Sequence, residues 1–411
     1  MYFKKQTKCR FCESKKLIEY LDLGQHPPSN SFVSKKDLNN QNYYPLVLML
    51  CKSCYLSQLS VVLDEKAVFD EYIYYSSSSK QLVEHYEKTV NYNIKKYHLH
   101  KNDFICDIGS NDGVLISRYP NNYINLIGIE PSKAFKQMKD KRVILINKFF
   151  NENLGKKIQK KFGKIKFISI TNVYAHIDNI IDFNNGLKKI MSKDSILMIE
   201  FPYLIDMIDK NYYDLIYHEH LSYLSLFPLN KLFKSQNMKI IDLKKVNIGA
   251  SGPAMRIYVT LKESKRKISK KVYDQLNYEK KWGINKISKY KNYKNKVQNN
   301  KIKLIELLNK LNKNNKLGGF SAPAKGNTLL NYCKLSNQTL IYISENNKDK
   351  IGKYTPGSNI KIISDDEFIK KKIKYALLLS WNYKKFFLKY SIFKKKGGKF
   401  IIPFPSPRII K

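Results

Sequence analysis

The sequence predicts an α/β protein with a doubly wound, mostly parallel sheet at its centre. Three observations support this fold class: apolar, strand-like runs alternate with helical spacers between residues 103 and 203, the first run ends in the glycine turn "DIGSNDG", and 411 residues suffice for two or three domains. No apolar run approaches the ~20 residues of a membrane span, and the start, "MYFKKQTKCR", lacks the apolar core of a secretory signal. We therefore expect a cytoplasmic protein with no membrane partner.

The chain is strongly basic, with a formal net charge of +41. Clustered lysine and arginine would indicate a nucleic-acid-binding surface. Here lysine is spread over every region and arginine is scarce, which is more typical of a solvated surface. We therefore expect no nucleic-acid partner, although a basic field would favour an acidic substrate such as a nucleotide diphosphate sugar.

Four of the six cysteines form two C-x-x-C pairs: Cys9 and Cys12 lie in "CRFC", and Cys51 and Cys54 lie in "CKSC". Two such turns brought together supply the four thiolates of a tetrahedral structural zinc site. Disulfides are the alternative, which a cytoplasm disfavours. Four cysteines would leave no open position on the metal, so we expect the zinc to hold structure and not to do chemistry.

The other elements follow in order along the chain. A helix is predicted from about Lys80 to Tyr97, after the stretch "EYIYYSSSS". Strands are predicted at "DFICDIG", "NLIGIEPS", "KFISITNVYAH" and "SILMIEFPY", and two later runs, "MKIIDLKKV" and "AMRIYVTL", are close enough to pair. Charged helices then lead into a second α/β unit that begins at "KLGGFSAPAKGNTLLNY". The predicted domains are a zinc-binding domain at residues 1–80, the α/β core at 81–262, a helical connector at 263–316, and a C-terminal α/β domain at 317–411.

The turn "DIGSNDG" carries the clearest cofactor signal. Asp107 ends the strand, Gly109 stands where the backbone must approach a ligand, and Gly113 is expected to open the next helix. A nicotinamide-binding turn reads G-x-G-x-x-G, and this chain lacks the middle glycine. Glu130 ends the following strand, where a carboxylate can accept both hydroxyls of a ribose. This pattern suits S-adenosylmethionine, which has no phosphate, and a generic strand–helix turn is the alternative.

Residues 217 to 220, "YHEH", gather two of the seven histidines beside a tyrosine and a glutamate. Two histidines and a carboxylate can hold zinc. The helical H-E-x-x-H spacing is absent, however, and residues one or two apart do not share a helix face. Histidine, with a pKa of ~6.5, also suits a general base. The pattern therefore favours acid–base groups over a metal site, and alternation along the chain would turn His218 away from its neighbours.

Taken together, these motifs resemble the sugar C-methyltransferases, which use S-adenosylmethionine to methylate a carbon of an NDP-4-keto-deoxyhexose. The resemblance covers nearly the whole chain and rests on the two cysteine pairs, "EYIYYSSSS", "DIGSNDG", "GIEPS", "TNVYAHIDN", "IYHEHLSYLSL", "SAPAKGNTLLNYC", "YTPGSNI" and "LLLSWNY", in that order. One segment departs from the pattern, since relatives carry H-G-G-S-x-R where this chain reads "GASGPAMRIYV". Which sugar and which position is methylated is therefore left open.

The resemblance implies a class I, Rossmann-like methyltransferase core between a small N-terminal zinc-binding domain with four cysteine ligands and a C-terminal Rossmann-like α/β domain. In such a site a base removes the proton beside the ketone, and the enolate carbon takes the methyl group in line. His220 is implied as the base, with Tyr217 as its partner or competitor and Glu219 orienting or contacting the substrate. His176 is a further site histidine, and Tyr74 is the tyrosine expected to enter the pocket.

The resemblance also implies where the cofactor lies: along Asp107, Gly109, Asn111, Gly113 and Glu130, with Asn172 near its methionine end. The implied partner is a small molecule, an NDP-sugar, and we expect a monomer.

Three alternatives stay open. An O-methyltransferase acting on a related sugar needs a base but no adjacent ketone. An RNA methyltransferase would agree with the zinc and the charge, but it predicts N-P-P-Y after the fourth strand, where this chain has "TNVYAH". A non-enzymatic zinc scaffold would give no reason for Glu130, His176 and "YHEH" to follow in one order.

Overall fold

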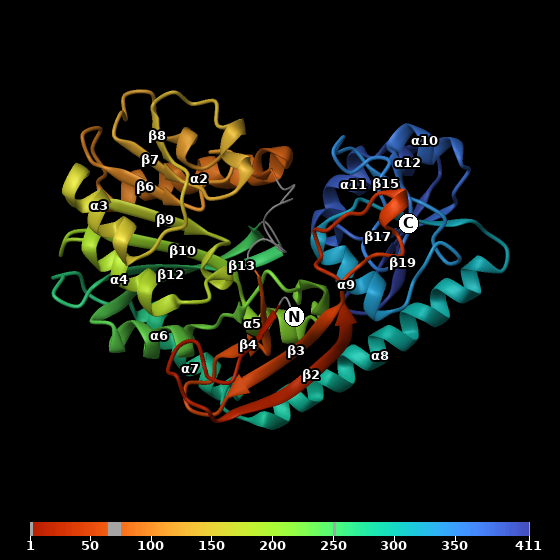
Figure 1. The fold of residues 1–411 in the computed structure, drawn as a ribbon, viewed down its shortest axis with the longest axis horizontal. Coiled ribbons are helices and arrows are strands. Elements are labelled where there is room, and N and C mark those ends of the chain that lie inside the picture. The colour runs from red at the N-terminus through yellow and green to blue at the C-terminus, as the bar shows by residue number, and fades with distance from the viewer. Residues whose placement is uncertain (1–2, 65–74, 250–251, 411) are drawn as a thin grey trace.

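The computed structural model describes residues 3–64, 75–249 and 252–410. Three sheets of seven, six and four strands mark a central, a C-terminal and an N-terminal unit (Figure 1). Within the described ranges, no helix combines the length and the apolar character that crossing a membrane requires.

The central unit is built on the seven-stranded sheet, with the order β12-β13-β10-β9-β6-β7-β8. Neighbours from β10 to β8 are parallel, whereas β13 runs antiparallel to both β10 and β12. The strands are β6 (Ile105–Ile108), β7 (Leu126–Ile129), β8 (Val143–Ile146), β9 (Phe167–Thr171), β10 (Ile196–Pro202), β12 (Met238–Gly249) and β13 (Gly252–Leu261). The inner parallel strands are almost fully buried, as expected where helices cover both faces.

Helices cover the two faces of this sheet separately. Helix α2 (Lys80–Tyr97) shares a core with Ile105 and Phe167 on one face. On the other face, Cys106 and Ile168 pack with α3 (Glu152–Phe162), α4 (Ile180–Ile190) and α6 (Leu226–Ser235). Successive strand residues point to opposite faces, which is why neighbours in sequence belong to different cores. This arrangement confirms the predicted α/β fold with a class I methyltransferase core.

The N-terminal unit is an antiparallel sheet of order β11-β4-β3-β2. Its strands are β2 (Leu17–His26), β3 (Tyr44–Cys51), β4 (Ser57–Leu59) and β11 (Ser222–Tyr223), and β1 (Phe3–Lys5) pairs separately with β5 (Val61–Leu63). Strand β11 comes from far along the chain, and its Ser222 pairs with Gln58 of β4. The residues directly after "YHEH" are therefore fixed in the N-terminal sheet.

The C-terminal unit is a sheet of order β16-β15-β14-β17-β18-β19, parallel except for β19. Its strands are β14 (Leu317–Phe320), β15 (Ile343–Glu345), β16 (Ile362–Ser364), β17 (Tyr375–Leu378), β18 (Lys399–Ile402) and β19 (Arg408–Ile410), and its helices are α9 (Ala324–Tyr332), α10 (Asp365–Lys370), α11 (Lys384–Tyr390) and α12 (Ile392–Lys395). Helix α9 follows the central strand β14, so it begins at the carboxyl edge of the sheet, where doubly wound folds bind ligands.

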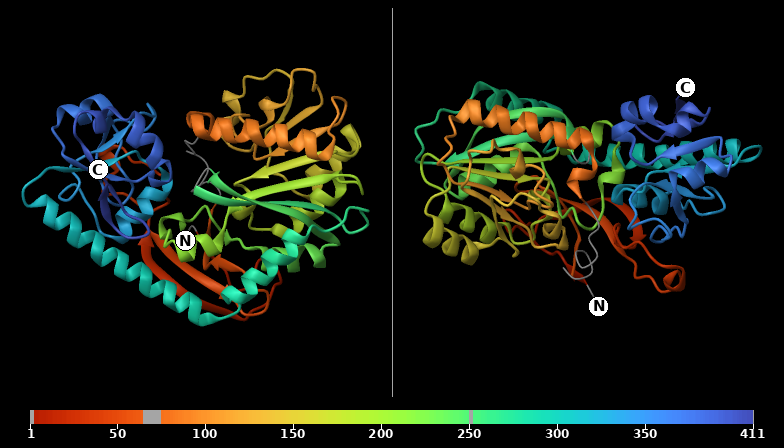
Figure 2. Two further views of the ribbon diagram at one scale, coloured as in Figure 1. Left: turned by 180° about the vertical axis from the view of Figure 1, so that it is seen from behind. Right: turned by 90° about the horizontal axis from the view of Figure 1, so that it is seen from above.

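Two helices, α7 (Lys270–Trp282) and α8 (Ile287–Asn312), connect the central and C-terminal units. Helix α8 packs on β2 and on β14 and runs along the outside of the molecule (Figures 1 and 2). Its buried residues, from Tyr290 to Leu308, belong to one core with Leu48 of the N-terminal sheet and Leu377 of the C-terminal sheet. The N-terminal and C-terminal units are thus joined by continuous hydrophobic packing.

Most predicted elements are present, and helix α2 has the predicted bounds. One expectation is wrong: no α-helix opens at Gly113, where a single 3-10 turn, η3 (Ile116–Arg118), follows instead. Pro120 lacks a backbone N–H and leaves too short a segment for a stable helix. The edge strand β8 was not predicted. The domain boundaries at residues 80, 262 and 316 stay a prediction.

Candidate active site

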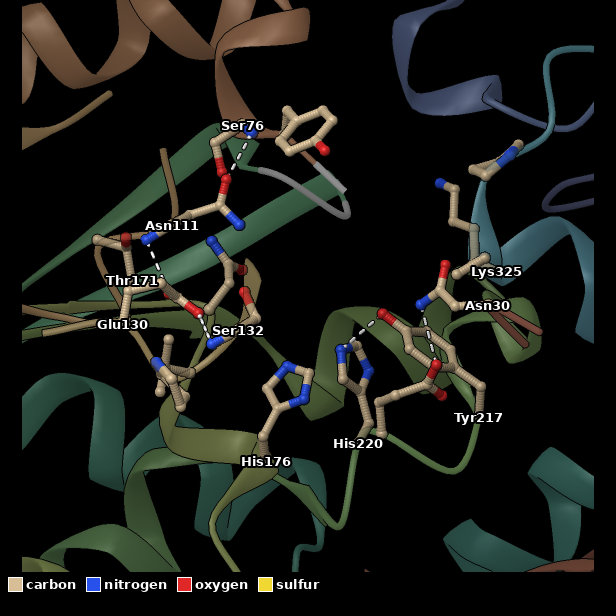
Figure 3. Close-up of a pocket in the computed structure, with 18 of the residues that line it drawn as sticks. Asn30, Ser76, Asn111, Glu130, Ser132, Thr171, His176, Tyr217, His220 and Lys325 are labelled. Carbon is tan, nitrogen blue, oxygen red and sulfur yellow. Dashed lines mark hydrogen bonds between the residues drawn. The ribbon is translucent and has the colours of Figure 1, made fainter. Parts of the chain in front are cut away.

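A cavity of about 1440 Å³ lies where the three units meet. Its lining includes Asn30 of the N-terminal unit, the loops after β6, β7 and β9, the "YHEH" residues, and residues 321–325 of the C-terminal unit. Single ligand pockets usually measure ~300–1,000 Å³. This cavity is therefore large enough for more than one small ligand, and Figure 3 shows part of its wall.

Glu130 lies at one end of the cavity, directly after β7. Its carboxylate accepts the backbone N–H groups of Asn111 and Ser132, each at 2.8 Å (Figure 3). These two bonds fix a carboxylate that is 6% exposed. An acidic group held at the end of this strand is the one that accepts ribose hydroxyls in Rossmann-like folds.

Gly109 forms the turn beside Glu130 and lines the cavity. Its φ is +74°, and a Cβ at this position would lie 2.2 Å from Cγ2 of Val173, so the turn requires glycine. Gly113 has a φ of +81° and is not among the lining residues, and a Cβ there would lie 1.9 Å from Sδ of Met138. Gly109 thus shapes the cavity wall, whereas Gly113 permits packing beneath the loop.

Asp107 and Asn172 both line the cavity; Asp107 is buried, and Asn172 is partly exposed although its amide atoms are buried. Asp107 accepts a hydrogen bond from Oγ of Ser169 at 2.6 Å, and burial raises the pKa of Asp107 to about 7. Asn172 has a φ of +57°, and neither its amide nitrogen nor its amide oxygen has a hydrogen-bond partner among the described residues. Buried polar atoms are normally satisfied, so we expect the Asn172 amide to meet a ligand. The bond from Ser169 to Asp107 was not predicted from the sequence.

The "YHEH" residues form a tight turn. The backbone N–H of His220 donates to the carbonyl oxygen of Tyr217 at 2.9 Å, which brings the first and last residues of the turn together. The rings of these two residues are 4.0 Å apart between centroids. His218 points to the N-terminal unit, where its Nε2 donates to the backbone oxygen of Pro45 at 3.3 Å. A turn, and not the alternation of a strand, therefore brings Tyr217 and His220 together and directs His218 away from them.

His220 is held in one tautomer by its two hydrogen bonds. Its Nδ1 lies 3.0 Å from the backbone oxygen of Leu215, which can only accept, so Nδ1 carries the hydrogen. Its Nε2 then accepts the O–H of Tyr217 at 2.8 Å. Burial and the neighbouring His176 hold the pKa of His220 well below its usual value. A neutral imidazole therefore presents a basic nitrogen at neutral pH.

His176 lies between the Glu130 end of the cavity and His220 (Figure 3). It follows β9 in the 3-10 turn η5 (Tyr174–His176), and its ring centroid is 4.9 Å from that of His220. Burial lowers the pKa of His176 to about 4, so it is also neutral near pH 7.

Glu219 is paired with the N-terminal unit. Its Oε1 accepts the side-chain N–H of Asn30 at 2.9 Å, and its Oε2 is buried without a hydrogen-bond partner in the part of the chain that is described. Burial raises the pKa of Glu219 to about 7. This carboxyl group can therefore donate or accept a proton near neutrality. Asn30, in "HPPSNSF", was missed because a single loop asparagine gives no signal in the sequence.

Tyr74, the predicted tyrosine of the pocket, lies outside the described residues. The residues that follow it dock on the turn at Gly109: Ser76 and Ser77 donate their backbone N–H groups to the side chains of Asn111 and Asp112, each at 3.0 Å. Ser76 and Ser77 therefore contact the predicted cofactor loop.

The C-terminal wall of the cavity carries two buried lysines. Nζ of Lys325 donates to Oδ1 of Asn382 at 2.7 Å and lies 3.9 Å from the ring centroid of Trp381. Burial lowers the pKa of Lys325 to about 8, an effect that Asp214 opposes. Lys350 donates to a backbone oxygen at 2.8 Å, and burial lowers its pKa as well. Two desolvated cations on one wall favour an anionic ligand.

The four predicted zinc ligands, Cys9, Cys12, Cys51 and Cys54, lie together away from the cavity, with all their sulfurs within 4.8 Å of one another. The Cys9–Cys54 and Cys12–Cys51 sulfurs are 3.4 and 3.6 Å apart, too far for a disulfide and close to the ~3.8 Å edge of a tetrahedral zinc–sulfur site. These residues fit zinc. Across the described ranges they form the one cluster of this kind, so "YHEH" is not a metal cluster.

Comparisons with known proteins agree with this architecture. Three family models match in succession: a zinc binding domain at residues 9–69, a methyltransferase domain at 81–243, and a C-methyltransferase C-terminal domain at 249–405. C-methyltransferase NovU of Streptomyces niveus is 27% identical over 406 residues, which are 98% of this chain and 96% of that protein.

Two solved structures cover less of the chain. A SAM-dependent methyltransferase from Anabaena variabilis is 12% identical, with a TM-score of 0.34, and covers 43% of this chain and 84% of its own. An S-adenosylmethionine-dependent methyltransferase from Clostridium acetobutylicum is 9% identical, with a TM-score of 0.32, and covers 44% of this chain and 92% of its own.

The matched models and the relative identify an S-adenosylmethionine-dependent C-methyltransferase. With all three models matched in order, the chain belongs to the C-methyltransferase family that combines an N-terminal zinc-binding domain with a characteristic C-terminal domain.

Gly109→Ala should weaken cofactor binding. The new Cβ would push on Val173 at the cavity wall, and we expect the Kd for S-adenosylmethionine, measured by calorimetry, to rise at least about 10-fold, or 1.4 kcal/mol. Gly163→Ala is the matched control, because Gly163 has a nearly equal φ of +75° and nothing within 4 Å of a new Cβ. Equal Kd values for both variants would contradict the assignment of Gly109.

Glu219→Gln should change how stability depends on pH. The folded-state pKa of about 7 lies above the ordinary value of 4.5, so the native protein binds more protons, and Glu219 costs stability as the pH rises through this window. The free energy of unfolding of the variant should therefore gain about 2–3 kcal/mol on the wild type between pH 5 and pH 8. The measurement is urea unfolding at both pH values. Glu84→Gln, at an exposed position, is the control, and a pH-independent difference for Glu219→Gln would contradict the account.

Proposed function

We propose that this enzyme methylates a carbon of a nucleotide-linked 4-keto-deoxy sugar, with His220 as the base. The observation that supports this proposal most is the Tyr217–His220 pair. It sets a neutral, tautomer-fixed imidazole into a cavity that also has a Glu130 end and a lysine-bearing wall.

The proposed cofactor residues are Asp107, Gly109, Asn111, Glu130 and Asn172, and Gly113 supports their loop from beneath. S-adenosylmethionine, when bound, supplies the electrophilic methyl group that the carbon nucleophile takes up. Glu130 is suited to accept the ribose hydroxyls, and the unsatisfied amide of Asn172 is suited to the amino-acid end.

A ketone makes the neighbouring C–H acidic, and a positioned base must take that proton. Nε2 of His220 is unprotonated and currently accepts the O–H of Tyr217. The proton therefore reaches Nε2 directly once Tyr217 turns away, or through the oxygen of Tyr217. Both routes leave the proton on the same nitrogen, while the Leu215 carbonyl keeps its bond to Nδ1.

The enolate oxygen that forms needs hydrogen-bond donors in a dry site. Glu219 can serve because its pKa of about 7 keeps much of it protonated near neutrality and its Oε2 has no partner among the described groups. Tyr217 can serve once Nε2 of His220 has taken the proton, because Nε2 then no longer accepts the O–H of Tyr217 and this O–H can turn to the enolate oxygen. We propose that these two groups stabilise the oxyanion, with His176 beside them.

The lysines of the C-terminal wall support an anionic substrate. Removing Lys325 and Lys350 from water is costly, and a diphosphate next to them would compensate that cost. We propose that the nucleotide end of the substrate lies along this wall, at the carboxyl edge of the C-terminal sheet. The sugar would then reach towards His220.

The substrate class is tested with a panel of NDP-4-keto-deoxyhexoses, incubated with the enzyme and S-adenosylmethionine carrying a labelled methyl group. We expect mass spectrometry and NMR of the product to place the label on a carbon next to the ketone. The matched NDP-hexoses without the ketone should stay unmodified, because they cannot form an enolate. A label on oxygen would overturn the proposal in favour of an O-methyltransferase.

His220→Gln should lower kcat about 10²- to 10⁴-fold, the usual contribution of a general base. The Kd for S-adenosylmethionine should stay within twofold, because His220 contacts Tyr217 and Leu215 and not the Glu130 end. His218→Gln is the matched control, because His218 lies two residues away, is also buried and bonds to Pro45. Full activity in His220→Gln would remove His220 as the base.

A further inference from the structure

Helix α9 of the C-terminal unit supports the "YHEH" turn from behind. Oγ1 of Thr328, which is fully buried, donates to the backbone oxygen of Ile216 at 2.7 Å. Ile216 is the residue between Tyr217 and Leu215, and the carbonyl of Leu215 holds Nδ1 of His220. One threonine of the C-terminal unit is therefore one peptide unit away from the group that sets the tautomer of His220.

The preceding residue of α9 supports the second acid–base group. The side-chain N–H of Asn327 donates to the backbone oxygen of Ser29 at 2.7 Å. Ser29 precedes Asn30, which donates to Oε1 of Glu219. Adjacent residues of α9 thus bond to two segments that are nearly 190 residues apart in the chain. One segment contacts Glu219 and the other contacts His220.

Other contacts hold the same turn against the C-terminal unit. Nε1 of Trp381 donates to Oδ2 of Asp214 at 2.6 Å, and Oη of Tyr213 donates to Oδ1 of Asn300 on α8 at 3.0 Å. These bonds anchor residues 213 and 214. The peptide that carries the Leu215 carbonyl is held on one side by the bond from the Ile216 N–H to the Tyr213 oxygen at 3.1 Å. The next carbonyl, that of Ile216, is held by Thr328.

We propose that Thr328 and Asn327 are positioning residues, through which the C-terminal unit orients the base and the carboxyl group of the active site. Thr328 fixes the carbonyl of Ile216 and thereby the position of the neighbouring Leu215 carbonyl, which keeps His220 with its hydrogen on Nδ1 and its lone pair on Nε2. Asn327 fixes the Ser29–Asn30 segment, and so keeps Asn30 on Glu219. The inference rests on the proposed roles of His220 and Glu219.

The test of Thr328 uses the imidazole itself as the readout. In protein labelled with ¹⁵N-histidine, the nitrogen shifts of His220, assigned by their loss in His220→Gln, report its tautomer independently of turnover. We expect the Nδ1–H tautomer in the wild type, a mixture of tautomers in Thr328→Val, and the wild-type pattern in Thr328→Ser, which keeps the hydroxyl. Thr260→Val is the control, since Thr260 is equally buried and its hydroxyl has no partner among the described residues.

Kinetics complete the test. We expect Thr328→Val to lower kcat about 10- to 100-fold, as for a small misplacement of a reacting group, with S-adenosylmethionine affinity unchanged and Thr328→Ser close to the wild type. Asn327→Asp, which loses the N–H donor, should lower kcat as well and leave the tautomer of His220 unchanged, because it acts on Glu219.

The outcomes separate this inference from the proposed function. An unchanged His220 tautomer in Thr328→Val would overturn the role of Thr328, whatever its activity. Loss of kcat that Thr328→Ser does not rescue would also overturn it. A shifted tautomer in Thr328→Val together with full activity in His220→Gln would instead support the positioning role of Thr328 and reject His220 as the base.

Discussion

The geometry of the active site depends on a short turn whose shape is imposed from outside. Residues 213–223 contain no regular element longer than three residues, so their conformation is set by the units around them. Strand β11 fastens one end to β4, and the other end bonds to α8, α9 and Trp381. The cysteine cluster supports this arrangement from a distance, because Cys51 ends β3 and Cys54 precedes β4. The N-terminal sheet and the helices α8 and α9 thus hold the segment that carries residues 217–220.

Burial alone explains much of the electrostatic character of the cavity, because it disfavours the charged form of every group. It lowers the pKa of His176 to about 4 and holds that of His220 below its usual value, and it raises the pKa values of Asp107 and Glu219 to about 7. Near neutrality the histidines are uncharged acceptors, and the carboxyls are partly protonated. In a site of this kind a proton can be transferred without first desolvating charged groups. Burial also lowers the pKa values of the two lysines on the opposite wall, to about 8 for Lys325. Lys325 therefore stays mostly charged near neutrality, and this wall is where we propose that the substrate anion binds.

Local patterns made much of this structure predictable. The apolar period of residues 80–97, the strand–turn at "DIGSNDG" and the paired cysteines each report on residues close in sequence, and each is found as expected. The helix expected after Gly113 failed because Pro120 ends that segment early. The roles of Asn30 and Thr328 could not be predicted from the sequence and that of Lys325 was left open, because each depends on a partner some 50 to 190 residues away. The resemblance implied Tyr217 as the partner or competitor of His220, but the turn that pairs them could not be predicted. A turn and a strand are both compatible with these four residues, and tertiary contacts decide between them.

The central claim is that His220 removes a proton from the carbon beside the ketone. Proton removal can be observed without methyl transfer by incubating an NDP-4-keto-deoxyhexose in D₂O with the enzyme and S-adenosylhomocysteine, which has no methyl group to give. We predict that NMR will show deuterium entering at that carbon with the wild type, and exchange about 10²-fold slower or more with His220→Gln. Equal exchange in both proteins, or no exchange in the wild type while methyl transfer proceeds at carbon, would contradict the account.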